Sequence, residues 1–578
     1  MASTQLPLET LSTWAMFNDV DLVDVEAREI PGCGLGLLSN KELSREEETF
    51  DIPTLLRIPG ELILSAEAVE NYAKVDKNFR QLLEAAGRKK VLSDRPKTSL
   101  KGGVSTPWTE YVKYLPPQVP VTTLWTEQER EMLNGTSLEA STFQAVLPQC
   151  LPASLESNIP VVVGQAGFVQ STCLTTINIA SQLPRNHFHM KVYSLASQSA
   201  TAAKIVALTD EFDELREISA TLPFWNELFW ESDKVSLIDW VRVDAWFRSR
   251  CLELPKSGEA MVPVLDLANH SSKANAYYEE NDKDEVVLLL RPGCRVSSGD
   301  EMTISYGDAK SGAEMLFSYG FIDPASAADR ITLPLIPMED DPLGKAKLHV
   351  FEGAPTVEFV RTNGSLSWKS PFAYFMCLNE EDGLSFRVLQ DTGGSRELKL
   401  FWQEEDVTAK ITAFERHIAE HPLAQIFRLR VVSVLEDLVA SQLERLATGM
   451  SLEDLDESLN EGGLVCGTCI SAAATLREQE TSLLEAAVKA LEDQFPYLSK
   501  SCNPSGFLLQ FDYSGAPSQL QTSPACGAKA NKGGRCAPTL QKTQLLADEN
   551  VVAYLGSMED AQNDLVQDEI SNEDEDFS

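Results

Sequence analysis

The spacing of apolar residues separates two strand-rich stretches from the helical segments that lie between and after them. Residues 22–66 and 261–306 contain short apolar runs broken by turn residues, which is typical of strands. From Thr106 the period becomes helical, with apolar side chains at i, i+3, i+4 and i+7: Trp108, Tyr111, Val112 and Leu115. Helical patterns return from Thr126, over 202–218 and over 222–250. The pattern predicts strands, a helical insert and then strands again.

A second region begins near residue 330 and has a different pattern. Segments 406–447 and 471–494 place apolar residues along one side of a long helix, in the second case Leu476, Leu483, Leu484, Ala487 and Leu491. From about residue 512 the chain is rich in Ser, Gly, Gln and Pro and then in acidic residues, a composition that predicts disorder. We therefore expect an α-helical domain over 330–510 and a disordered acidic tail over 512–578.

Residues 145–200 differ from the sequence on both sides of them. The segment holds three charged residues (Glu156, Arg185 and Lys191), although the 24% charged content of the whole chain predicts about thirteen. It shows no sustained period of a helix or a strand. Its removal would bring Thr136–Leu138 close to the helical pattern at 202–218. We interpret it as an unstructured insertion, of the kind that a translated intron would produce.

The composition limits the class of protein. A chain of 578 residues should form two to four domains, and its 43% hydrophobic and 24% charged residues are ordinary for a soluble protein. No uncharged apolar run reaches the roughly 18 residues that a membrane helix needs. The first 25 residues lack the basic start of a secretory signal, and eleven scattered cysteines fit reduced thiols. We expect a cytoplasmic or nuclear monomer, or one found in both compartments, with no membrane contact.

The formal net charge of −38 indicates which partners the surface favours. The eleven acidic residues from Asp548 onward contribute −11, so −27 remains for the rest of the chain. Such a surface repels nucleic-acid phosphates and attracts basic proteins. We expect a basic protein partner and no nucleic acid, although mere solubility is an equally good reading of the charge.

A glycine-rich turn, Gly32-Cys33-Gly34-Leu35-Gly36, lies in the first strand-rich stretch. Turn glycines serve left-handed backbone positions in many β proteins, so the motif alone has little specificity. It also mimics the glycine pattern of Rossmann-type methyltransferases, which requires a buried apolar strand before it and a helix after it. The preceding residues 25–29 are too polar for such a strand, and Leu37-Leu38-Ser39 continues as strand. We therefore interpret the glycines as a β turn.

The most specific pattern lies over 263–322. It consists of Pro-Val-Leu-Asp-Leu-Ala-Asn-His-Ser at 263–271, Glu-Met-Thr-Ile-Ser-Tyr-Gly at 301–307 and Phe-Ser-Tyr-Gly-Phe-Ile at 317–322. An Asn-His pair followed by two Tyr-Gly pairs thirteen residues apart resembles the C-terminal half of a SET domain. The resemblance implies an α+β chain with a β-rich knotted SET fold, and an enzyme that moves a methyl group from S-adenosylmethionine to lysine.

The remainder of the chain resembles the Rubisco large-subunit methyltransferase class of SET proteins. Many histone-directed SET enzymes have cysteine-rich flanks, which are missing here, whereas this class has a helical insert and a helical C-terminal domain. The resemblance implies a SET domain in two parts, 15–105 and 246–325, a helical insert over 106–245 and a substrate-binding domain over 330–510.

The same resemblance implies which residues hold the cofactor. The backbone of Cys33, Gly34 and Leu35 would lie along one edge of the site, and Asn269 would hold the methionine part. The backbone of His270 would meet the adenine, so we do not assign its ring as a general base. Arg250, in Ser249-Arg250, would grip the cofactor carboxylate by charge-assisted hydrogen bonds. Leu254 departs from the family, which often has a second basic residue there.

Tyr306 matches the catalytic tyrosine of the family. Methyl transfer to lysine is an in-line displacement that requires a neutral amine, an aligned lone pair and excluded water. Because free lysine has a pKa of about 10.4, the site must favour the neutral form, which an apolar aromatic channel can do. The Tyr306 hydroxyl would orient the amine. Tyr319 would contact both cofactor and channel, and Tyr277 is a further candidate for the channel wall.

Other enzyme motifs do not occur in the sequence, and two alternatives to lysine methylation stay open. GxSxG, HExxH and the P-loop are missing, and Cys466-Gly467-Thr468-Cys469 is a C-x-x-C without a matching pair, so we expect no metal. The expected substrate is a non-histone protein, with a ribosomal or translation-related protein as one option. The chain could instead methylate histidine, or be a non-catalytic SET-fold binding protein.

Overall fold

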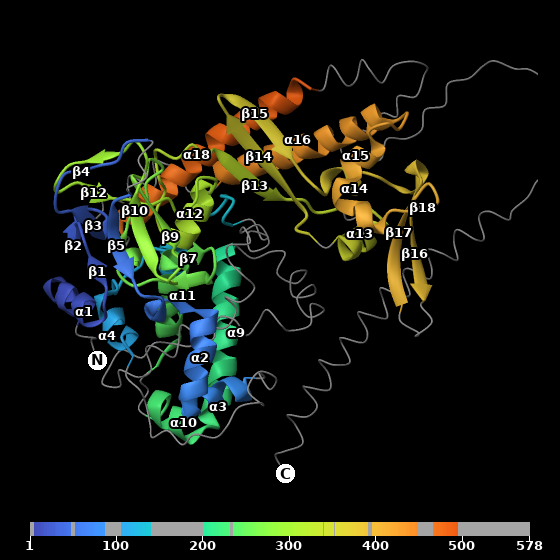
Figure 1. Ribbon diagram of the computed structural model, residues 1–578. Helices are drawn as coiled ribbons and strands as arrows, with labels where there is room; N and C mark the ends of the chain where they lie inside the picture. Colours follow the sequence, from blue (N-terminus) through green and yellow to red (C-terminus); the bar gives the residue numbers. More distant parts are fainter. Residues whose placement is uncertain are drawn as a thin grey trace, which may run out of the picture. The chain divides into compact units, whose positions relative to one another are not determined.

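The computed structural model describes residues 5–47, 52–86, 106–139, 200–231, 235–338, 340–351, 353–390, 396–448 and 466–494. The predicted insertion is described only at Ala200, and the predicted acidic tail lies wholly outside these ranges. The chain forms two compact units (Figure 1). Of the described residues, those within 1–334, 358–368 and 439–487 belong to the first unit, and those within 335–357, 369–438 and 488–494 belong to the second.

The sheets of the first unit are made from strands that lie far apart in the sequence. The largest has the order β1-β5-β10-β9, and two three-stranded sheets have the orders β12-β3-β2 and β6-β8-β7. A further pair joins β11 to β4. Each of these sheets combines strands from before residue 70 with strands from after residue 250, as the two predicted strand-rich stretches require. The strands are β1 (Asp21–Leu22), β2 (Val25–Ile30), β3 (Gly34–Ser39), β4 (Leu43–Ser44), β5 (Thr54–Ile58), β6 (Leu64–Ser65), β7 (Leu252–Leu254), β8 (Gly258–Met261), β9 (Ala276–Glu280), β10 (Val286–Leu290), β11 (Arg295–Val296) and β12 (Glu301–Met302).

The glycine-rich turn joins two antiparallel strands. β2 pairs with β3 in a register that sets Ile30 opposite Gly34, and Gly32 and Gly34 have φ values of +82° and +81°. Glycine reaches this left-handed region without steric penalty, which explains its use at both positions. Because Gly34–Ser39 is a strand and not a helix, the Rossmann alternative is excluded.

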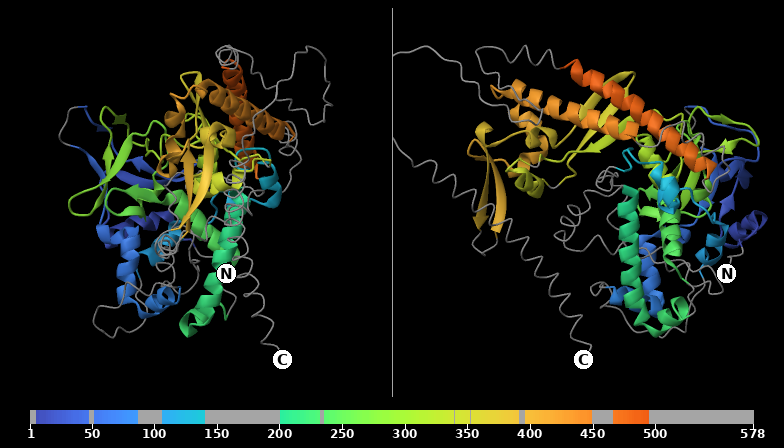
Figure 2. Two further views of the ribbon diagram at one scale, coloured as in Figure 1. Left: turned by 90° about the vertical axis from the view of Figure 1, so that its right-hand side faces the viewer. Right: turned by 180° about the vertical axis from the view of Figure 1, so that it is seen from behind.

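The helical insert contains short helices followed by longer ones. The pattern from Thr106 forms α4 (Trp108–Tyr111) and a 3-10 turn, Val112–Tyr114. Thr126 begins α5 (Glu127–Glu131) through a reciprocal capping box with Glu129. Beyond residue 199 the elements are α9 (Ala200–Ala220), α10 (Pro223–Phe229) and α11 (Leu237–Arg250), and α12 (Gly312–Tyr319) follows the last strands (Figure 2).

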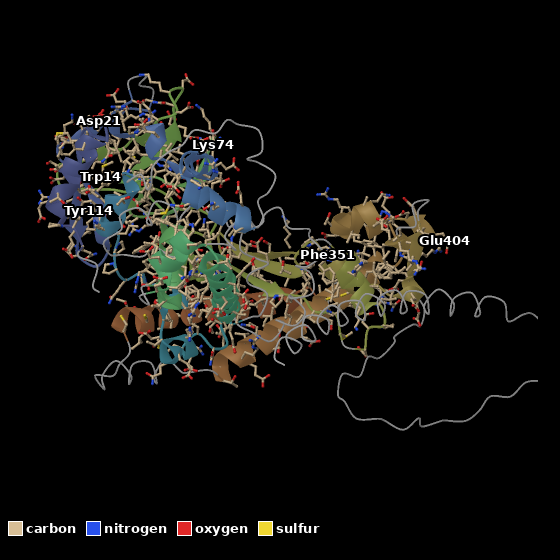
Figure 3. All side chains as sticks on the ribbon, turned by 90° about the horizontal axis from the view of Figure 1, so that it is seen from below. Trp14, Asp21, Lys74, Tyr114, Phe351 and Glu404 are labelled. Atoms are coloured by element: carbon tan, nitrogen blue, oxygen red, sulfur yellow. The ribbon has the colours of Figure 1, made fainter. Side chains whose placement is uncertain are left out.

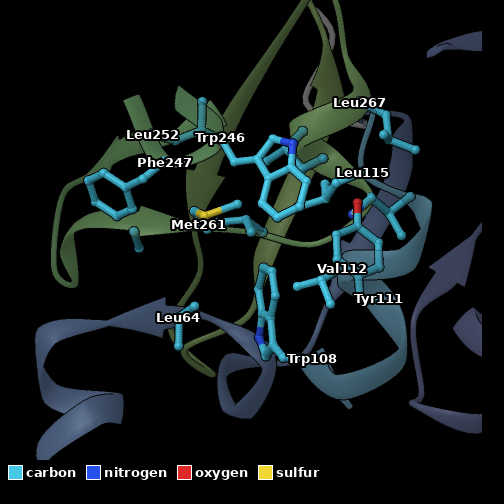
Figure 4. Close-up of a cluster of buried hydrophobic side chains, with 14 of the residues drawn as sticks. Leu64, Trp108, Tyr111, Val112, Leu115, Trp246, Phe247, Leu252, Met261 and Leu267 are labelled. Atoms are coloured by element: carbon cyan, nitrogen blue, oxygen red, sulfur yellow. The ribbon is translucent and has the colours of Figure 1, made fainter. Parts of the chain in front are cut away.

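Aromatic side chains from the insert and from α11 fill the core next to these strands. Trp108, Tyr111 and Trp246 lie together with Met261 and Leu267 (Figure 4). Each tryptophan also satisfies its ring N–H: Trp108 donates to the carbonyl of Leu62 at 2.9 Å, and Trp246 to that of Pro116 at 2.7 Å. Large aromatic rings contribute much buried apolar area, so this cluster fixes α11 against the strands.

The N-terminal helices pack onto the same insert. A 3-10 turn, Leu8–Thr10, leads into α1 (Leu11–Phe17), whose Trp14 donates to the carbonyl of Pro107 at 3.2 Å. The hydroxyls of Thr10 and Tyr114 are 2.8 Å apart, and Trp14 and Tyr114 are both labelled in Figure 3. α2 (Ala66–Val75) and α3 (Lys77–Ala85) begin at the caps Ser65 and Asp76.

The backbone meets itself on the two sides of the undescribed segment 140–199. The N–H of Ala200 donates to the carbonyl of Leu138 at 2.8 Å, and both residues are 1% exposed. In an α-helical turn such a bond joins residues i and i+4. A link of two residues after Glu139 would give Leu138 and Ala200 that spacing. The rest of the fold therefore has no need of a long connection here.

We expect that a chain with a two-residue link in place of 140–199 folds as the full chain does. Its melting temperature should stay within about 4 °C of that of the full chain. As a control, a link that also removes Ser137 should lower the melting temperature of the protein, because the Ser137 N–H donates to Glu480 at 2.8 Å. Circular dichroism during heating measures both. Loss of cooperative unfolding in the first variant would show that 140–199 belongs to the fold.

The C-terminal region contains the predicted long helices and also strands that were not predicted. α16 (Ala424–Thr448) and α18 (Gly467–Glu492) confirm the helical character, but the first begins eighteen residues later than the predicted 406. Residues 330–406 form two three-stranded sheets, with the orders β13-β14-β15 and β16-β17-β18. The other elements are β13 (Arg330–Pro334), α13 (Gly344–Val350), β14 (Thr356–Thr362), β15 (Ser365–Lys369), α14 (Ala373–Met376), β16 (Leu384–Gln390), β17 (Arg396–Trp402), β18 (Glu405–Asp406) and α15 (Phe414–Ile418).

Among the described helices, none combines the length and the apolar content that crossing a membrane requires.

Candidate active site

The site is built around the turn that follows β8. Val264 is fully buried and has a φ of +72°, which is rare and costly for a β-branched residue. Tyr111 holds this turn from the insert: its hydroxyl accepts from the Val264 N–H at 2.7 Å and donates a very short hydrogen bond to Asp266. The strained turn thus directs Asp266 through His270 toward the residues after β12.

Backbone hydrogen bonds join the Asn269–His270 pair to the segment after β12. The Ile304 N–H donates to the Asn269 carbonyl at 3.0 Å, and the Ser271 N–H donates to the Ile304 carbonyl at 3.1 Å. Asn275 adds a side-chain clamp, donating to the Glu301 carbonyl at 2.8 Å and accepting from the Thr303 N–H at 2.9 Å. These contacts bring the two halves of the sequence motif together.

Tyr306 is fixed at both its hydroxyl and its backbone. Its hydroxyl donates to the Ala268 carbonyl at 2.8 Å, and its N–H donates to Nδ1 of His270 at 3.0 Å. Burial raises the pKa of the Tyr306 phenol far above its ordinary value, so the hydroxyl keeps its proton at neutral pH. The structure therefore presents a neutral, oriented phenol.

His270 has a supporting position. Because Nδ1 accepts from the Tyr306 N–H, the ring proton of the neutral form lies on Nε2, which is 3.4 Å from Oδ2 of Asp323. Burial lowers the pKa of His270 despite the nearby Asp323 carboxylate, which favours the neutral ring. Both ring nitrogens of His270 thus have a polar neighbour within the protein, so the ring is not placed to act as a general base.

Tyr306 belongs to a cluster of four aromatic rings, with His270, Tyr319 and Phe321. The ring centroids of Tyr306 and Tyr319 are 4.7 Å apart, and His270 lies 5.3 Å from Tyr306. Phe321 completes the group at 6.4 Å from Tyr306 and 6.0 Å from His270. Phe321 was not predicted as a site residue, although it stands within the recognised 317–322 motif. The cluster forms an apolar surface suited to a flat ring.

The helix α12 delivers Tyr319 and Phe321 to this cluster. It begins with a capping box between Ser311 and Glu314 and ends at Gly320, whose φ is +83°. A Cβ on Gly320 would lie only 2.5 Å from the carbonyl carbon of Pro120. Glycine at this position therefore allows both the left-handed end of the helix and its close approach to the insert.

A cavity of about 570 Å³ opens beside the Tyr306 ring. Its wall combines apolar and polar residues from β7, β8, β9, α11, α12 and the two motif segments. Lining residues include Arg250, Leu252, Asp266, Tyr278, Ile304 and Tyr319. A cavity of this size, with a few polar groups on an apolar wall, fits a small ligand or a side chain.

The structure does not bring Tyr277 to this cavity; its neighbour Tyr278 lines the wall instead. Adjacent residues on a strand point to opposite faces, and both tyrosines lie on β9. The Tyr277 hydroxyl accepts from Arg45 at 3.3 Å, and Arg291 lies over its ring. Tyr278 is therefore the better candidate for the channel wall.

Of the residues predicted to hold a cofactor, Arg250 and Tyr319 line the cavity, whereas Cys33, Gly34, Leu35, Asn269 and His270 are not among its lining residues. Arg250 donates to the Asp266 carbonyl at 2.8 Å, and its buried Nε has no hydrogen-bond partner within the described residues. Asn269 donates to Glu301 at 2.7 Å. A Cβ on Gly36 would lie 2.9 Å from the Asn269 amide nitrogen, so only glycine lets β3 approach this closely. Cys33, at the exposed turn, and Gly34 and Leu35 belong to the same hairpin.

The donors fit a cofactor that carries a carboxylate and an adenine. The guanidinium of Arg250, which lines the cavity and lies 3.6 Å from the Asp266 carboxylate, suits an anionic group, and the Asn269 amide suits a polar one. The rings of Tyr319 and Phe321 suit a flat base. Gly36, Phe321 and Tyr278 extend the predicted set; Gly36 could have been found only through the backbone approach that the fold reveals.

Outside this site, three potential metal ligands lie close together, which bears on the prediction that the protein binds no metal. Glu129, Cys466 and Cys469 have ligand atoms within 4.8 Å of one another, so the structure gives the C-x-x-C pair a third neighbour. The Glu129 carboxylate already accepts from Thr126 N–H at 2.8 Å, from the Thr126 hydroxyl at 3.0 Å and from Cys466 N–H at 2.9 Å.

We expect the purified protein to contain no stoichiometric zinc, since a structural zinc site uses four protein ligands and the described residues supply three here. Elemental analysis after dialysis tests this, with the Cys466→Ser variant as the matched control. One zinc per chain that disappears in Cys466→Ser would contradict the expectation.

Known proteins similar to this chain share its fold. No family model matches the chain. It is 34% identical over 333 residues to SET domain-containing protein 8 of Schizosaccharomyces pombe, covering 57% of this chain and 72% of that protein. It is 24% identical over 328 residues to the chloroplastic Rubisco large subunit N-methyltransferase of Pisum sativum, covering 55% and 52%. The crystal structure of the SET domain of LSMT bound to lysine and AdoHcy superposes with a TM-score of 0.53 at 21% identity, covering 85% of this chain and 92% of that chain.

Proposed function

The chain belongs to the SET domain-containing proteins, in the class that resembles the Rubisco large-subunit methyltransferase, and we propose that it methylates a lysine of a protein using S-adenosylmethionine. The observation that carries this proposal is the position of the Tyr306 hydroxyl. Tyr306 is half-buried, its hydroxyl keeps its proton and is fixed on the Ala268 carbonyl, and the residue lies beside a cavity with room for one long side chain.

The residues that would hold the cofactor are Arg250, Asn269, Tyr319, Phe321 and the backbone of 33–35. When bound, S-adenosylmethionine supplies a methyl group on a positively charged sulfur. Arg250 would pair with the carboxylate by charge-assisted hydrogen bonds, and Asn269 would accept or donate at the methionine part. The aromatic cluster would pack against the adenine. The backbone at His270 lies next to that cluster.

The cavity wall would prepare the acceptor amine. Leu252 and Ile304 exclude water from their part of the wall, and Tyr306 offers a hydroxyl oxygen that can accept a hydrogen bond from the amine. This contact would aim the nitrogen lone pair, and the rate of an in-line displacement depends chiefly on such alignment. The apolar and aromatic part of the wall also disfavours a charged ammonium, since burial penalises the charged form.

The acidity of the chain supports a basic substrate. With a net charge of −38, the protein attracts lysine-rich surfaces over distances of about 8–10 Å in physiological salt. Such a substrate could be a ribosomal or translation-related protein, and we propose a non-histone target of this kind. Its compartment, cytoplasm or nucleus, stays a prediction.

Transfer of a labelled methyl group tests the proposal. Extract from cells that lack the protein should be incubated with methyl-tritiated S-adenosylmethionine and purified enzyme. We expect label in one or a few protein bands, and none with heat-denatured enzyme. An intact protein that binds the cofactor in calorimetry but labels nothing would instead favour the non-catalytic SET-fold alternative.

Replacing Asn269 with Ala is expected to weaken cofactor binding. One hydrogen bond to a charged or strongly polar ligand contributes about 1.5–3 kcal/mol, so the dissociation constant should rise about 10- to 100-fold. Isothermal calorimetry measures the change. The matched control is Asn71→Ala on the exposed face of α2, which should bind as the wild type does. Equal affinity of both variants would contradict the placement of Asn269.

A further inference from the structure

Glu259 is a carboxylate on the cavity wall that neither holds the cofactor nor orients the amine in the proposed reaction. Glu259 lies on β8, directly opposite Glu253 of β7, so two acidic side chains are cross-strand neighbours. Glu259 lines the same cavity as Tyr306 and Tyr319. Like charges placed opposite each other destabilise a strand pair, so the arrangement is costly unless one of them carries a proton or meets a cation.

The buried oxygen of Glu259 lacks a partner. Its Oε2 atom is inaccessible to solvent and forms no hydrogen bond within the part of the chain that the structure describes. A buried polar atom without a partner costs about 1–3 kcal/mol. Because Glu259 lines the cavity, a small turn of its carboxylate toward a substrate ammonium there would supply the missing contact and offset this cost.

Burial and the charge of Glu253 raise the pKa of Glu259 to about 8. Lys310 opposes this shift, and its Nζ is held on the Tyr306 carbonyl at 2.8 Å. Cys251 also lies within electrostatic reach of Glu259. Other charged and titratable groups line the same cavity from the elements packed around it, among them Arg250 of α11, Tyr278 of β9 and Glu314 of α12. A carboxyl with a pKa near neutral can both receive and release a proton under physiological conditions.

We propose that Glu259 receives the proton that a substrate lysine must lose before methyl transfer. This inference rests on the proposed function and deepens it, because it names the group that converts the ammonium to the reactive amine. It also names the acceptor class. A primary ammonium has a proton to give up at neutral pH, whereas an imidazole with a pKa of about 6.5 is already mostly neutral.

The step balances without a further reactant. An N–H bond of the ammonium breaks and an O–H bond forms on Glu259, which leaves the lone pair on nitrogen. That pair forms the N–C bond to the methyl group while the C–S bond breaks, and its electrons stay on sulfur. The methylated nitrogen carries the positive charge after transfer. Glu259 then releases its proton to solvent, which resets it for the next turnover.

The pH dependence of turnover tests the proposal. In the wild type, kcat/KM should rise with pH and level off above about pH 8, where Glu259 is unprotonated before substrate binds. In Glu259→Gln it should be at least about 10-fold lower at neutral pH. It should then keep rising toward about pH 10, where solvent deprotonates free lysine, so that the deficit shrinks.

Glu253→Gln is the matched control, since it removes the neighbouring charge but keeps Glu259. The loss of that charge should lower the pKa of Glu259 and move the plateau to lower pH, opposite to the Glu259→Gln shift. Cofactor affinity by calorimetry should be unchanged in both variants. A Glu259→Gln loss that is the same at every pH, or that comes from weaker cofactor binding, would overturn the proposal.

The outcome is separable from a failure of the proposed function. If the wild type transfers no methyl group, the function itself is wrong. If the wild type methylates lysine and Glu259→Gln keeps the wild-type pH profile, only the assignment of Glu259 is wrong.

Discussion

Replacing Tyr306 with Phe should lower kcat by about 100-fold or more, with cofactor affinity unchanged. The substitution keeps the ring that packs on Tyr319 at 4.7 Å and removes only the hydroxyl held on Ala268 at 2.8 Å. Loss of a group that aligns the reacting atoms costs a rate factor on the order of 10². Single-turnover kinetics with saturating cofactor measures the chemical step directly.

Tyr277, a tyrosine of β9 outside the cavity, provides the control for this experiment. Tyr277→Phe removes a hydroxyl that meets Arg45 and does not line the cavity, so its turnover should stay close to wild type. Unchanged turnover in Tyr306→Phe would exclude the Tyr306 hydroxyl from the chemical step. A large loss in Tyr277→Phe would show that Tyr277 serves the channel as first predicted.

Replacing Asp244 with Ala should lower the free energy of unfolding by about 3–5 kcal/mol, because it leaves two cations buried without their partner. Asp244 is fully buried and pairs with Lys204 of α9 at 3.2 Å and with Arg248 at 2.9 Å. Arg248 also donates to the Phe317 carbonyl of α12 at 2.6 Å. Asp244 and its two partners therefore tie α9 to α11, which carries Arg250, and to α12, which carries Tyr319.

Urea denaturation with tryptophan fluorescence measures this loss. The control is Arg242→Ala on the same helix, which breaks the partly exposed pair with Asp239 and should cost less than about 1 kcal/mol. An equal loss of unfolding free energy in the two variants would show that the buried contacts of Asp244 stabilise the protein no more than the Asp239–Arg242 pair does.

The contacts of Asp244 with Lys204 and Arg248 also predict how the free energy of unfolding changes with pH. Burial alone would raise the pKa of Asp244, but the charges of Lys204 and Arg248 outweigh it and hold the pKa below its ordinary value. A lowered pKa in the folded state means that this stabilisation is fully present above the unfolded pKa, about 3.9. It is lost as pH falls below that value, and Asp244→Ala should be less sensitive to pH in that range.

Much of the site could be predicted because its residues lie in short sequence motifs. Asn269, Tyr306 and Tyr319 lie in motifs with fixed spacing, and the structure brings them to one place. The short apolar runs near 22–66 and 261–306 likewise predicted the strands, because runs of this length bounded by turn residues are typical of strands. Tyr277 and Tyr278 show the limit, since adjacent residues carry the same side chain and only the strand pairing decides which one faces the cavity.

Other features depend on contacts between distant residues that no local pattern encodes. Glu259 belongs to the site because β8 pairs with β7, and its unpartnered oxygen is visible only once burial is known. Glu129 meets Cys466 across more than 300 residues of sequence. The strands between residues 330 and 406 were missed because their short apolar runs resemble loops between helices, so the helical pattern after 424 dominated the prediction.

The central claim is that the cavity beside Tyr306 receives a lysine. Its most direct test is the identity of the methylated amino acid: total hydrolysis of the labelled substrate, followed by chromatography against standards. We predict that the label co-elutes with methylated lysine and that Tyr306→Phe removes it. Label in methylhistidine would contradict the claim, and would assign the same fold and cofactor site to a different acceptor.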